Sequence, residues 1–189
     1  MDRGARGAPA RSLKARAIQL LAQREHSRLE LKRKLLPHAV AEDAHAGEAS
    51  DEIDANASAG ELATRAAERV DALLDWLADN QYLSEQRFAE SRVHARASRF
   101  GNLRIRQELA QHGVGLSAIA ESSLKDTELA RARAVWARKF SSPPANPAEH
   151  AKQARFLAGR GFPGDLIRQV LRQPSRAGSD DEPTPARSG

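Results

Sequence analysis

The chain has 189 residues, a length that suits one or two ordinary domains or a run of small stacked units sharing one core. Ala, Leu, Arg and Glu dominate and aromatic residues make up 4%, so the composition favours an all-helical fold without strands. With no cysteine, the sequence excludes disulfides, thiolate nucleophiles and zinc–thiolate sites. No apolar run approaches the roughly 18 residues of a membrane span, and the basic stretch 1–11 is expected to be a flexible tail rather than a signal peptide.

The formal net charge of +5 is unevenly distributed along the chain. Residues 1–38 carry ten Lys or Arg against three acids, residues 39–64 carry seven acids and no Lys or Arg, and residues 65–178 carry nineteen Lys or Arg against twelve acids. A basic body with an acidic insertion favours phosphate-bearing or acidic partners. The alternative is an ordinary solvated surface with an Arg-rich bias.

The first predicted elements are two helices. An amphipathic stripe from Leu13 predicts a helix that ends near His26. Ser27 and Glu30 then form a capping box, in which the Ser hydroxyl accepts from the Glu30 amide while the Glu30 side chain reaches back. We expect Pro37 to end the second helix, because its ring clashes with the preceding turn.

From about 39 to 63 the sequence lacks a sustained hydrophobic period, which predicts a disordered or weakly helical insertion. Periodicity returns at Val70 in a long helix that ends near Asn80. Further helices are predicted over about 84–99, around Ile105, over about 117–124, along the stripe 129–140, from Asn146 to about 160, and over 163–172. The sum is nine helices.

An internal repeat emerges when the helix joints are aligned. Each joint has a Leu, an apolar residue five positions later and another five or six after that: Leu77, Tyr82 and Phe88; Leu109, Val114 and Ile119; Leu157, Phe162 and Ile167. This spacing is typical of a helix end, a tight turn and a next helix that packs back. Gly113 and Gly161 directly precede the apolar residue of the turn, where a left-handed residue commonly closes a helix. Gln81 takes this place in the joint that begins at Leu77.

The joints therefore predict three tandem three-helix repeats that stack into an elongated, curved array. The expected organisation is a basic tail (1–11), repeat 1 (12–79, with the acidic insertion at about 39–63), repeat 2 (80–125), repeat 3 (126–173) and a disordered tail (174–189).

The sequence contains none of the common catalytic or cofactor-binding motifs. The six His residues never pair at helical spacing, and no phosphate-cradling glycine loop, dinucleotide fingerprint or nucleophile elbow is present. Asp71, Asp75 and Asp79 lie four residues apart, but a solvated helix face explains them better than a metal site. We therefore predict a protein that is not an enzyme, with no metal and no cofactor.

A cluster of cations is the stronger lead. Arg92, Arg96 and Arg99 fall within about 60° of one helix face, so their guanidinium groups could follow a phosphate backbone or an acidic groove. Phe100 could stack on a base or plug a joint. The candidate binding surface comprises Lys32, Arg33, Lys34, Arg87, Arg92, Arg96, Arg99, Arg104 and Arg106.

The middle of the chain resembles the bacterial RecX regulatory proteins. The residues that carry this resemblance are Tyr82-Leu83, Arg87-Phe88-Ala89, Arg104-Ile105 with Glu108-Leu109, and Gly113-Val114. Weaker matches at 27–35 and 156–171 extend it to most of 12–173. The acidic insertion departs from the family pattern, and no Gly-hydrophobe turn follows Pro37.

The resemblance implies a protein of tandem three-helix repeats that binds the RecA filament on single-stranded DNA, and we expect it to be cytoplasmic and monomeric. Such a protein modulates, and usually inhibits, strand exchange, ATP hydrolysis and repressor cleavage by RecA in DNA repair, recombination and the SOS response. Because the sequence has no long apolar run, we expect no membrane contact. The alternative is a helix-turn-helix protein that binds DNA directly, because short joints with Arg on the second helix also suit duplex DNA.

Overall fold

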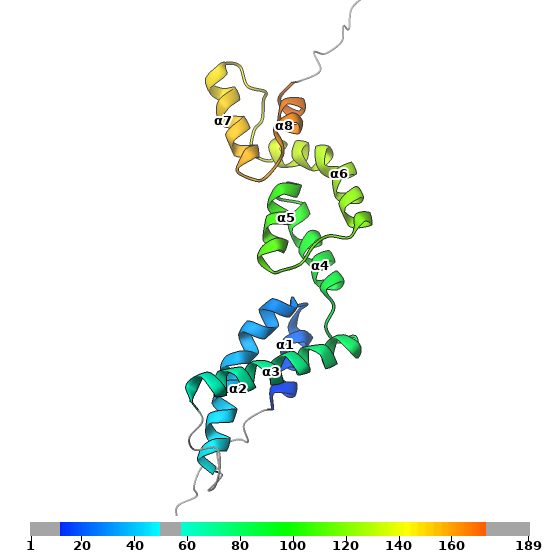
Figure 1. Cartoon of the computed structure of the whole chain (residues 1–189). Coiled ribbons are helices and arrows are strands. Elements are labelled where there is room, and N and C mark those ends of the chain that lie inside the picture. Colours follow the sequence, from blue (N-terminus) through cyan, green and yellow to red (C-terminus); the bar gives the residue numbers. More distant parts are fainter. Residues whose placement is uncertain (1–11, 50–57, 173–189) are drawn as a thin grey trace, which may run out of the picture. The chain divides into compact units, whose positions relative to one another are not determined.

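The computed structural model describes residues 12–49 and 58–172 (Figure 1). Within these ranges it contains eight α-helices: α1 (Leu13–Gln23), α2 (Arg28–Ala49), α3 (Ala59–Asp79), α4 (Glu85–Ala97), α5 (Asn102–Gln111), α6 (Ala118–Ala137), α7 (Pro147–Ala158) and α8 (Gly164–Leu171). The described residues contain no strand, as the composition predicts. The two predicted tails and the central part of the insertion, residues 50–57, lie outside the described residues.

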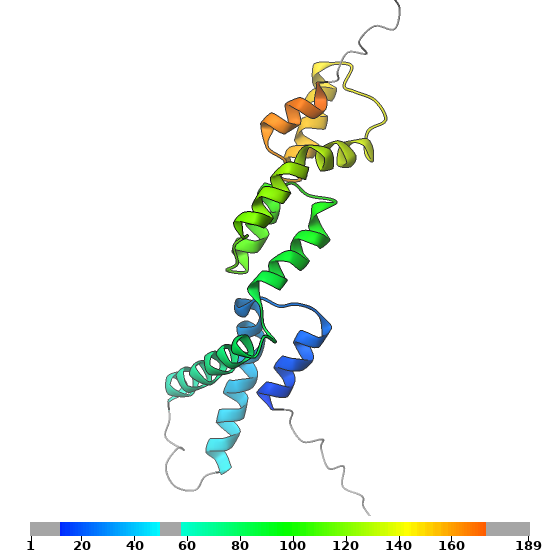
Figure 2. The same cartoon turned by 90° about the vertical axis from the view of Figure 1, so that its right-hand side faces the viewer.

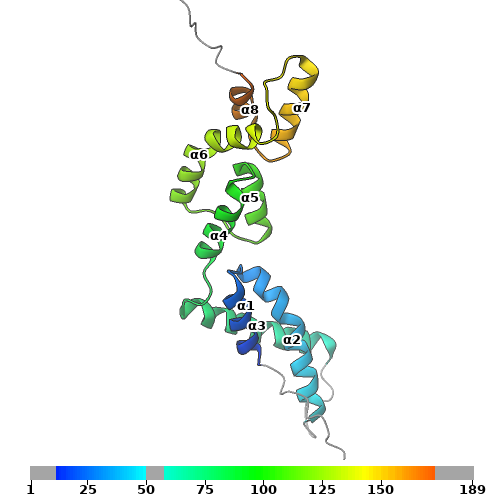
Figure 3. The ribbon, with the colours of Figure 1, turned by 180° about the vertical axis from the view of Figure 1, so that it is seen from behind.

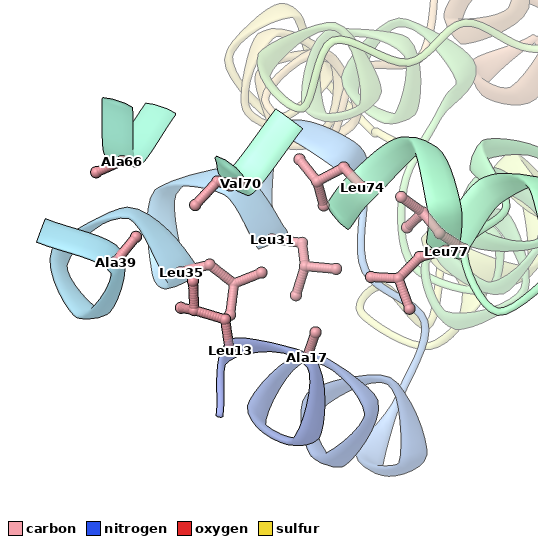
Figure 4. Packing of buried hydrophobic residues seen from close by; sticks show 10 residues of the cluster. Leu13, Ala17, Leu31, Leu35, Ala39, Ala66, Val70, Leu74 and Leu77 are labelled. Carbon is pink, nitrogen blue, oxygen red and sulfur yellow. The ribbon is translucent and has the colours of Figure 1, made fainter. Parts of the chain in front are cut away.

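The described residues fall into two units. Unit 1 lies within Met1–Arg96 and Ile105–Glu121, and unit 2 lies within Ala97–Arg104 and Ser122–Gly189. In unit 1, α2 packs against both α1 and α3 (Figure 3). Figure 4 shows the resulting core, in which leucines of α1, α2 and α3 point toward one another.

Helix α2 does not end at Pro37, which corrects the expectation from sequence. The helix runs through this residue to Ala49. Pro37 is exposed, whereas Leu35 and Ala39 on either side of it are fully buried in the core of unit 1. Burial of these side chains against α3 offsets the hydrogen bond that a proline cannot donate. Because the helix continues, no turn is needed after Pro37.

The predicted insertion is helical at both ends. Residues up to Ala49 extend α2, and Ser58 begins α3 with a capping box: the Ser58 hydroxyl accepts from the Glu61 amide at 3.3 Å, and Glu61 accepts from the Ser58 amide at 2.7 Å. At the predicted capping box of α2, the Ser27 hydroxyl accepts from the Glu30 amide at 3.1 Å, while the Glu30 carboxylate instead contacts Arg24.

The three predicted joints are closed by the same turn. In each, an amide donates to the carbonyl of a buried leucine five positions earlier: Tyr82 to Leu77 at 2.9 Å, Val114 to Leu109 at 3.1 Å, and Phe162 to Leu157 at 3.3 Å. The residue before each donor has a positive φ: 61° at Gln81, 72° at Gly113 and 82° at Gly161. These are Schellman turns, and they confirm the alignment on which the internal repeat rests.

One member of the repeat pattern behaves differently from the expectation. Phe88 and Ile167 are buried, but Ile119 is 84% exposed and does not pack back on the preceding helix. Ile119 lies in the first turn of α6, and the buried apolar residue of that helix in this region is Leu124.

Helix α6 replaces two predicted helices, so the described part of the chain has eight helices rather than nine. The segment 125–128 contains neither Gly nor Pro, and the helix continues through it. Figure 1 shows a bend within α6. Within α6, the Leu124 carbonyl accepts from the Thr127 hydroxyl at 3.3 Å and from Arg131 at 2.9 Å, side-chain bonds of the kind that bend helices.

The hydrophobic core of unit 2 is supplied by α6, α7, α8 and the turn between α7 and α8 (Figure 2). Its buried residues are Ala132, Val135, Leu157, Phe162, Ile167, Val170 and Leu171. As the sequence predicts, Asn146 caps α7, accepting from the Glu149 amide at 2.9 Å, and Pro147 opens the helix. The segment that leads into α5 is bonded to the α7–α8 turn, because the Gly101 amide donates to the Arg160 carbonyl at 2.9 Å.

Candidate functional site

The predicted cations on α2 are largely paired with acids. The Lys32 ammonium lies 2.6 Å from Asp71 on α3, and Lys34 lies 3.5 Å from Glu30. Arg33 is exposed. Asp75 binds Arg28 at 2.8 Å, so two of the three aspartates on α3 bind cations of α2. Of the three predicted cations on α2, Lys32 therefore links this helix to α3, and Lys34 pairs within α2.

Arg87 connects three segments of unit 1. Its guanidinium lies 2.8 Å from Glu25, which lies between α1 and α2, and it donates to the backbone carbonyls of Gln81 and Tyr82 at 2.9 and 3.1 Å. These contacts tie the start of α4 to the turn that precedes it and to the α1–α2 connection.

Arg92 and Arg96 share one carboxylate. Glu108 on α5 accepts from Arg92 at 3.2 Å and from Arg96 at 3.0 Å. The Arg92 guanidinium also lies 5.3 Å from the ring centre of Phe88, which is buried. Two of the three arginines of the predicted stripe thus hold α4 against α5 within unit 1.

The remaining predicted cations lie near Phe100 or, in the case of Arg106 on α5, contact the first turn of α6. Arg104 and Arg99 approach the Phe100 ring to 4.9 and 5.8 Å, and Arg104 donates to the Gly159 carbonyl at 3.4 Å. Arg106 lies 3.4 Å from Glu121, with both side chains 47% exposed. An exposed pair of this kind adds little stability, so Arg106 stays accessible.

The strongest electrostatic perturbation lies at the start of α2. Burial lowers the pKa of His26, which is 1% exposed, and Arg24 lowers it further. Burial opposes ionisation of Glu30 too, but the hydrogen bond from Arg24 and the nearby positive charges lower the pKa of Glu30 to about 2. This cluster secures the α1–α2 joint.

A buried network holds the segment before α5 in unit 2. Glu128 is 5% exposed, and its carboxylate accepts from the Asn102 amide at 2.7 Å. Arg131 donates to the Phe100 carbonyl at 2.9 Å and to the Asn102 side chain at 2.5 Å. Burial lowers the pKa of Arg131, which Glu128 partly offsets.

A basic cavity of about 190 Å³ opens in unit 2. Its lining residues are four cations, one aromatic ring and one aliphatic side chain: Arg99, Arg138, Lys139, Arg160, Phe156 and Val135. Among the described residues, none of the four cations forms an ion pair with a carboxylate. The cavity therefore differs from the candidate surface in unit 1, where most of the cations pair with carboxylates.

Comparison with known proteins places these features in a family. The model of the second three-helix domain of RecX matches residues 84–122, and that of the third three-helix domain matches residues 126–171. Two proteins named Regulatory protein RecX show the likeness over most of the chain. That of Ralstonia pickettii (strain 12J) is 42% identical over 172 residues, covering 90% of this chain and 89% of its own, and that of Ralstonia nicotianae is 46% identical over 162 residues, covering 85% and 86%. The chain belongs to the RecX family.

The fold agrees with this assignment. The crystal structure of RecX from Lactobacillus salivarius matches with a TM-score of 0.55 at 17% identity, over 84% of this chain and 92% of that one. The two RecX domain models meet within α6, so this helix supplies the third helix of one three-helix domain and the first helix of the next. The three-helix repeats predicted from the joints are confirmed for the second and third domains.

The described residues contain no group of three His, Asp or Glu side chains placed to hold a metal ion. No helix among them is both long and apolar enough to cross a membrane.

Sequence reasoning missed the basic cavity. Its cations come from the segments just after α4, α6 and α7, and no periodicity connects such distant positions. The adjacent pair Arg138-Lys139 before Phe140 is the one local signal in the sequence.

Proposed function

We propose that the chain regulates the RecA recombinase by binding its filament on single-stranded DNA, and that it inhibits strand exchange, ATP hydrolysis and the coprotease activity of RecA. In this proposal it acts in the cytoplasm as a monomer, in DNA repair and the SOS response, and without catalysis of its own.

The observation that carries the proposal is family membership. The relatives at 35–46% identity are named regulatory proteins, and the match covers both RecX domain models as well as the helices before them. The charge distribution supports it, because a filament of protein on DNA presents phosphates and carboxylates that attract a basic surface.

The binding surface that we propose includes the cations predicted from sequence. Arg33, Arg99, Arg104 and Arg106 are exposed, and of these only Arg106 contacts a carboxylate among the described residues, in a pair with Glu121 that is itself exposed. Lys32, Lys34, Arg87, Arg92 and Arg96 can contribute only with part of their charge, because each already binds a carboxylate.

ATP hydrolysis by RecA on single-stranded DNA, measured with substoichiometric amounts of the full chain, tests this proposal. We expect hydrolysis and strand exchange to fall as the protein is added, with no effect of a matched amount of bovine serum albumin. Unchanged hydrolysis and unchanged strand exchange would overturn the proposal.

Direct binding to duplex DNA is the second candidate. The observation that favours it is α5, the second helix of the second three-helix domain, which exposes Arg104 and Arg106. Binding to bare duplex at several salt concentrations separates the two candidates. Tight, steeply salt-dependent duplex binding without any effect on RecA would favour the DNA-binding function.

A further inference from the structure

The basic cavity of unit 2 gathers positive charge that the rest of the described chain does not neutralise. Four of its six lining residues are cations and none is acidic. Like charges held close together repel one another, and an anion that enters the cavity removes this repulsion. The cavity therefore favours the binding of a negatively charged ligand.

Two of the guanidinium groups are held in place before any ligand arrives. Arg138 donates from Nε to the Ala134 carbonyl at 3.2 Å and from Nη2 to the Ser98 carbonyl, which leaves other N–H donors of its five unused. The Arg160 guanidinium lies 4.5 Å from the ring centre of Phe156, and Phe140 packs edge-on against the same ring with centroids 5.2 Å apart. A fixed guanidinium loses little entropy when it binds.

Arg160 has an unused hydrogen-bonding group. Its Nε is buried and has no hydrogen-bond partner among the described residues. A buried donor without a partner costs free energy, so this guanidinium is not fully satisfied by the described residues. The guanidinium also lies over the Phe156 ring, and guanidinium planes and aromatic rings are the groups on which nucleic-acid bases stack.

The arrangement fits a phosphate group better than a carboxylate. A carboxylate presents two oxygens in one plane and suits one or two cations, as Glu108 does with Arg92 and Arg96 in unit 1. A phosphate is tetrahedral and accepts hydrogen bonds from several sides, which suits cations that converge from the segments after α4, α6 and α7. A phosphate at the bottom of a cavity also requires a flexible backbone, which a single strand has and a stiff duplex lacks.

We propose that the cavity lined by Arg99, Arg138, Lys139 and Arg160 binds a backbone phosphate of single-stranded nucleic acid, with a neighbouring base against the Arg160–Phe156 stack. Phosphate binding rests on the cavity itself, whereas the choice of a single strand as the source rests on the proposed function. The cavity then gives the third three-helix domain a direct contact with DNA.

The test compares two double variants of the full chain that change the charge equally. Arg138→Gln/Lys139→Gln removes from the cavity the Arg and the Lys that directly follow α6, and Lys125→Gln/Arg133→Gln removes one Lys and one Arg from exposed positions within that helix. Binding of a fluorescein-labelled oligothymidylate is measured by anisotropy at several salt concentrations, without RecA. We expect the cavity variant to bind about tenfold more weakly, with a salt slope smaller by about 0.7 for each phosphate that is no longer neutralised, and the control variant to bind within about twofold of the wild type.

Equal weakening by both variants, or by neither, would overturn the proposal. So would normal oligonucleotide binding by the cavity variant with a specific loss of binding to RecA filaments, because that result would assign the cavity to protein carboxylates. Arg138 also supports the backbone at Ser98, so the single variant Lys139→Gln provides a second readout that leaves this hydrogen bond intact. We expect it to weaken oligonucleotide binding about threefold with an unchanged circular dichroism spectrum.

Titration of inorganic phosphate alone distinguishes the two sources of phosphate. We expect phosphate to bind the wild type weakly, not to bind the cavity variant, and to bind far less tightly than the oligonucleotide. Inorganic phosphate that bound as tightly as the oligonucleotide would assign the cavity to a small phosphate ligand and overturn the nucleic-acid proposal. Because these titrations contain no RecA, a failure here is distinct from a failure of RecA regulation.

Discussion

Both units contain the same Schellman turn, but their arginine and lysine side chains have different partners. In unit 1, Arg87, Arg92 and Arg96 meet carboxylates supplied by other segments. In unit 2, Arg138 contacts backbone carbonyls and Arg99 and Arg160 lie near aromatic rings, and no carboxylate neutralises the four cations around the cavity within the described residues. A count of Lys and Arg along the sequence cannot separate these cases, because what distinguishes a structural cation from a binding one is its partner in space.

The largest expected effect is on the free energy of unfolding when the glycine of this turn is replaced in each unit. Gly113 and Gly161 both have positive φ, but a Cβ at Gly113 would have room, with Leu29 3.9 Å away, whereas a Cβ at Gly161 would lie 2.6 Å from Arg104. We expect Gly161→Ala to lower the free energy of unfolding by about 3 kcal/mol and Gly113→Ala by about 1 kcal/mol. Urea unfolding followed by circular dichroism measures both. Equal losses would show that the close approach in unit 2 adds no constraint.

The second prediction concerns the charge cluster at the start of α2. The folded-state pKa of Glu30, about 2, lies below its ordinary value of 4.5, so its contribution to stability is present above pH 4.5 and is lost as the pH falls toward 2. The lowered pKa of His26 acts earlier, because protonation of this buried ring favours unfolding as the pH falls below 6.5. We expect Glu30→Gln to cost on the order of 2 kcal/mol at pH 7, and the difference from the wild type to shrink below pH 4.5.

Unfolding measured as a function of pH checks this prediction, with His26→Gln as the companion variant for the transition near neutral pH. A difference between Glu30→Gln and the wild type that stayed constant from pH 7 to pH 3 would contradict it.

The third prediction would turn part of unit 1 into an unpaired basic surface. Glu108→Gln removes the carboxylate shared by Arg92 and Arg96, so we expect a loss of about 1 kcal/mol in unfolding free energy and about threefold tighter binding of a single-stranded oligonucleotide. Glu121→Gln is the matched control, because its pair with Arg106 is exposed and should contribute within about 0.5 kcal/mol. If the Glu108→Gln and Glu121→Gln variants bound the oligonucleotide with equal affinity, the ion pairs with Glu108 would not be what keeps Arg92 and Arg96 from binding it.

The turns could be predicted from sequence because their determinants are local. A leucine, a left-handed residue and an apolar residue lie within six positions, and their hydrogen bonds close inside the same segment. Pro37 was predicted wrongly because its effect depends on the packing of Leu35 and Ala39 against α3. The prediction of two helices in place of α6 also failed, because no local sequence signal separates the end of one three-helix domain from the start of the next.

The candidate site was predictable in residue type but not in pairing. Lys32 and Asp71 are 39 positions apart and Arg87 and Glu25 are 62 apart, so neither ion pair leaves a periodic signal. The cavity of unit 2 depends on residues from three separate segments, and it becomes visible only when the chain is folded.

Inhibition of RecA by three forms of the chain tests the account most directly. ATP hydrolysis by RecA on single-stranded DNA is measured with the wild type, with Arg138→Gln/Lys139→Gln and with Lys125→Gln/Arg133→Gln at equal concentrations. We predict that the wild type and the control variant inhibit to a similar degree and that the cavity variant needs about tenfold more protein for the same inhibition. A wild-type chain that left hydrolysis unchanged would contradict the proposed function, and equal inhibition by all three would contradict the role of the cavity.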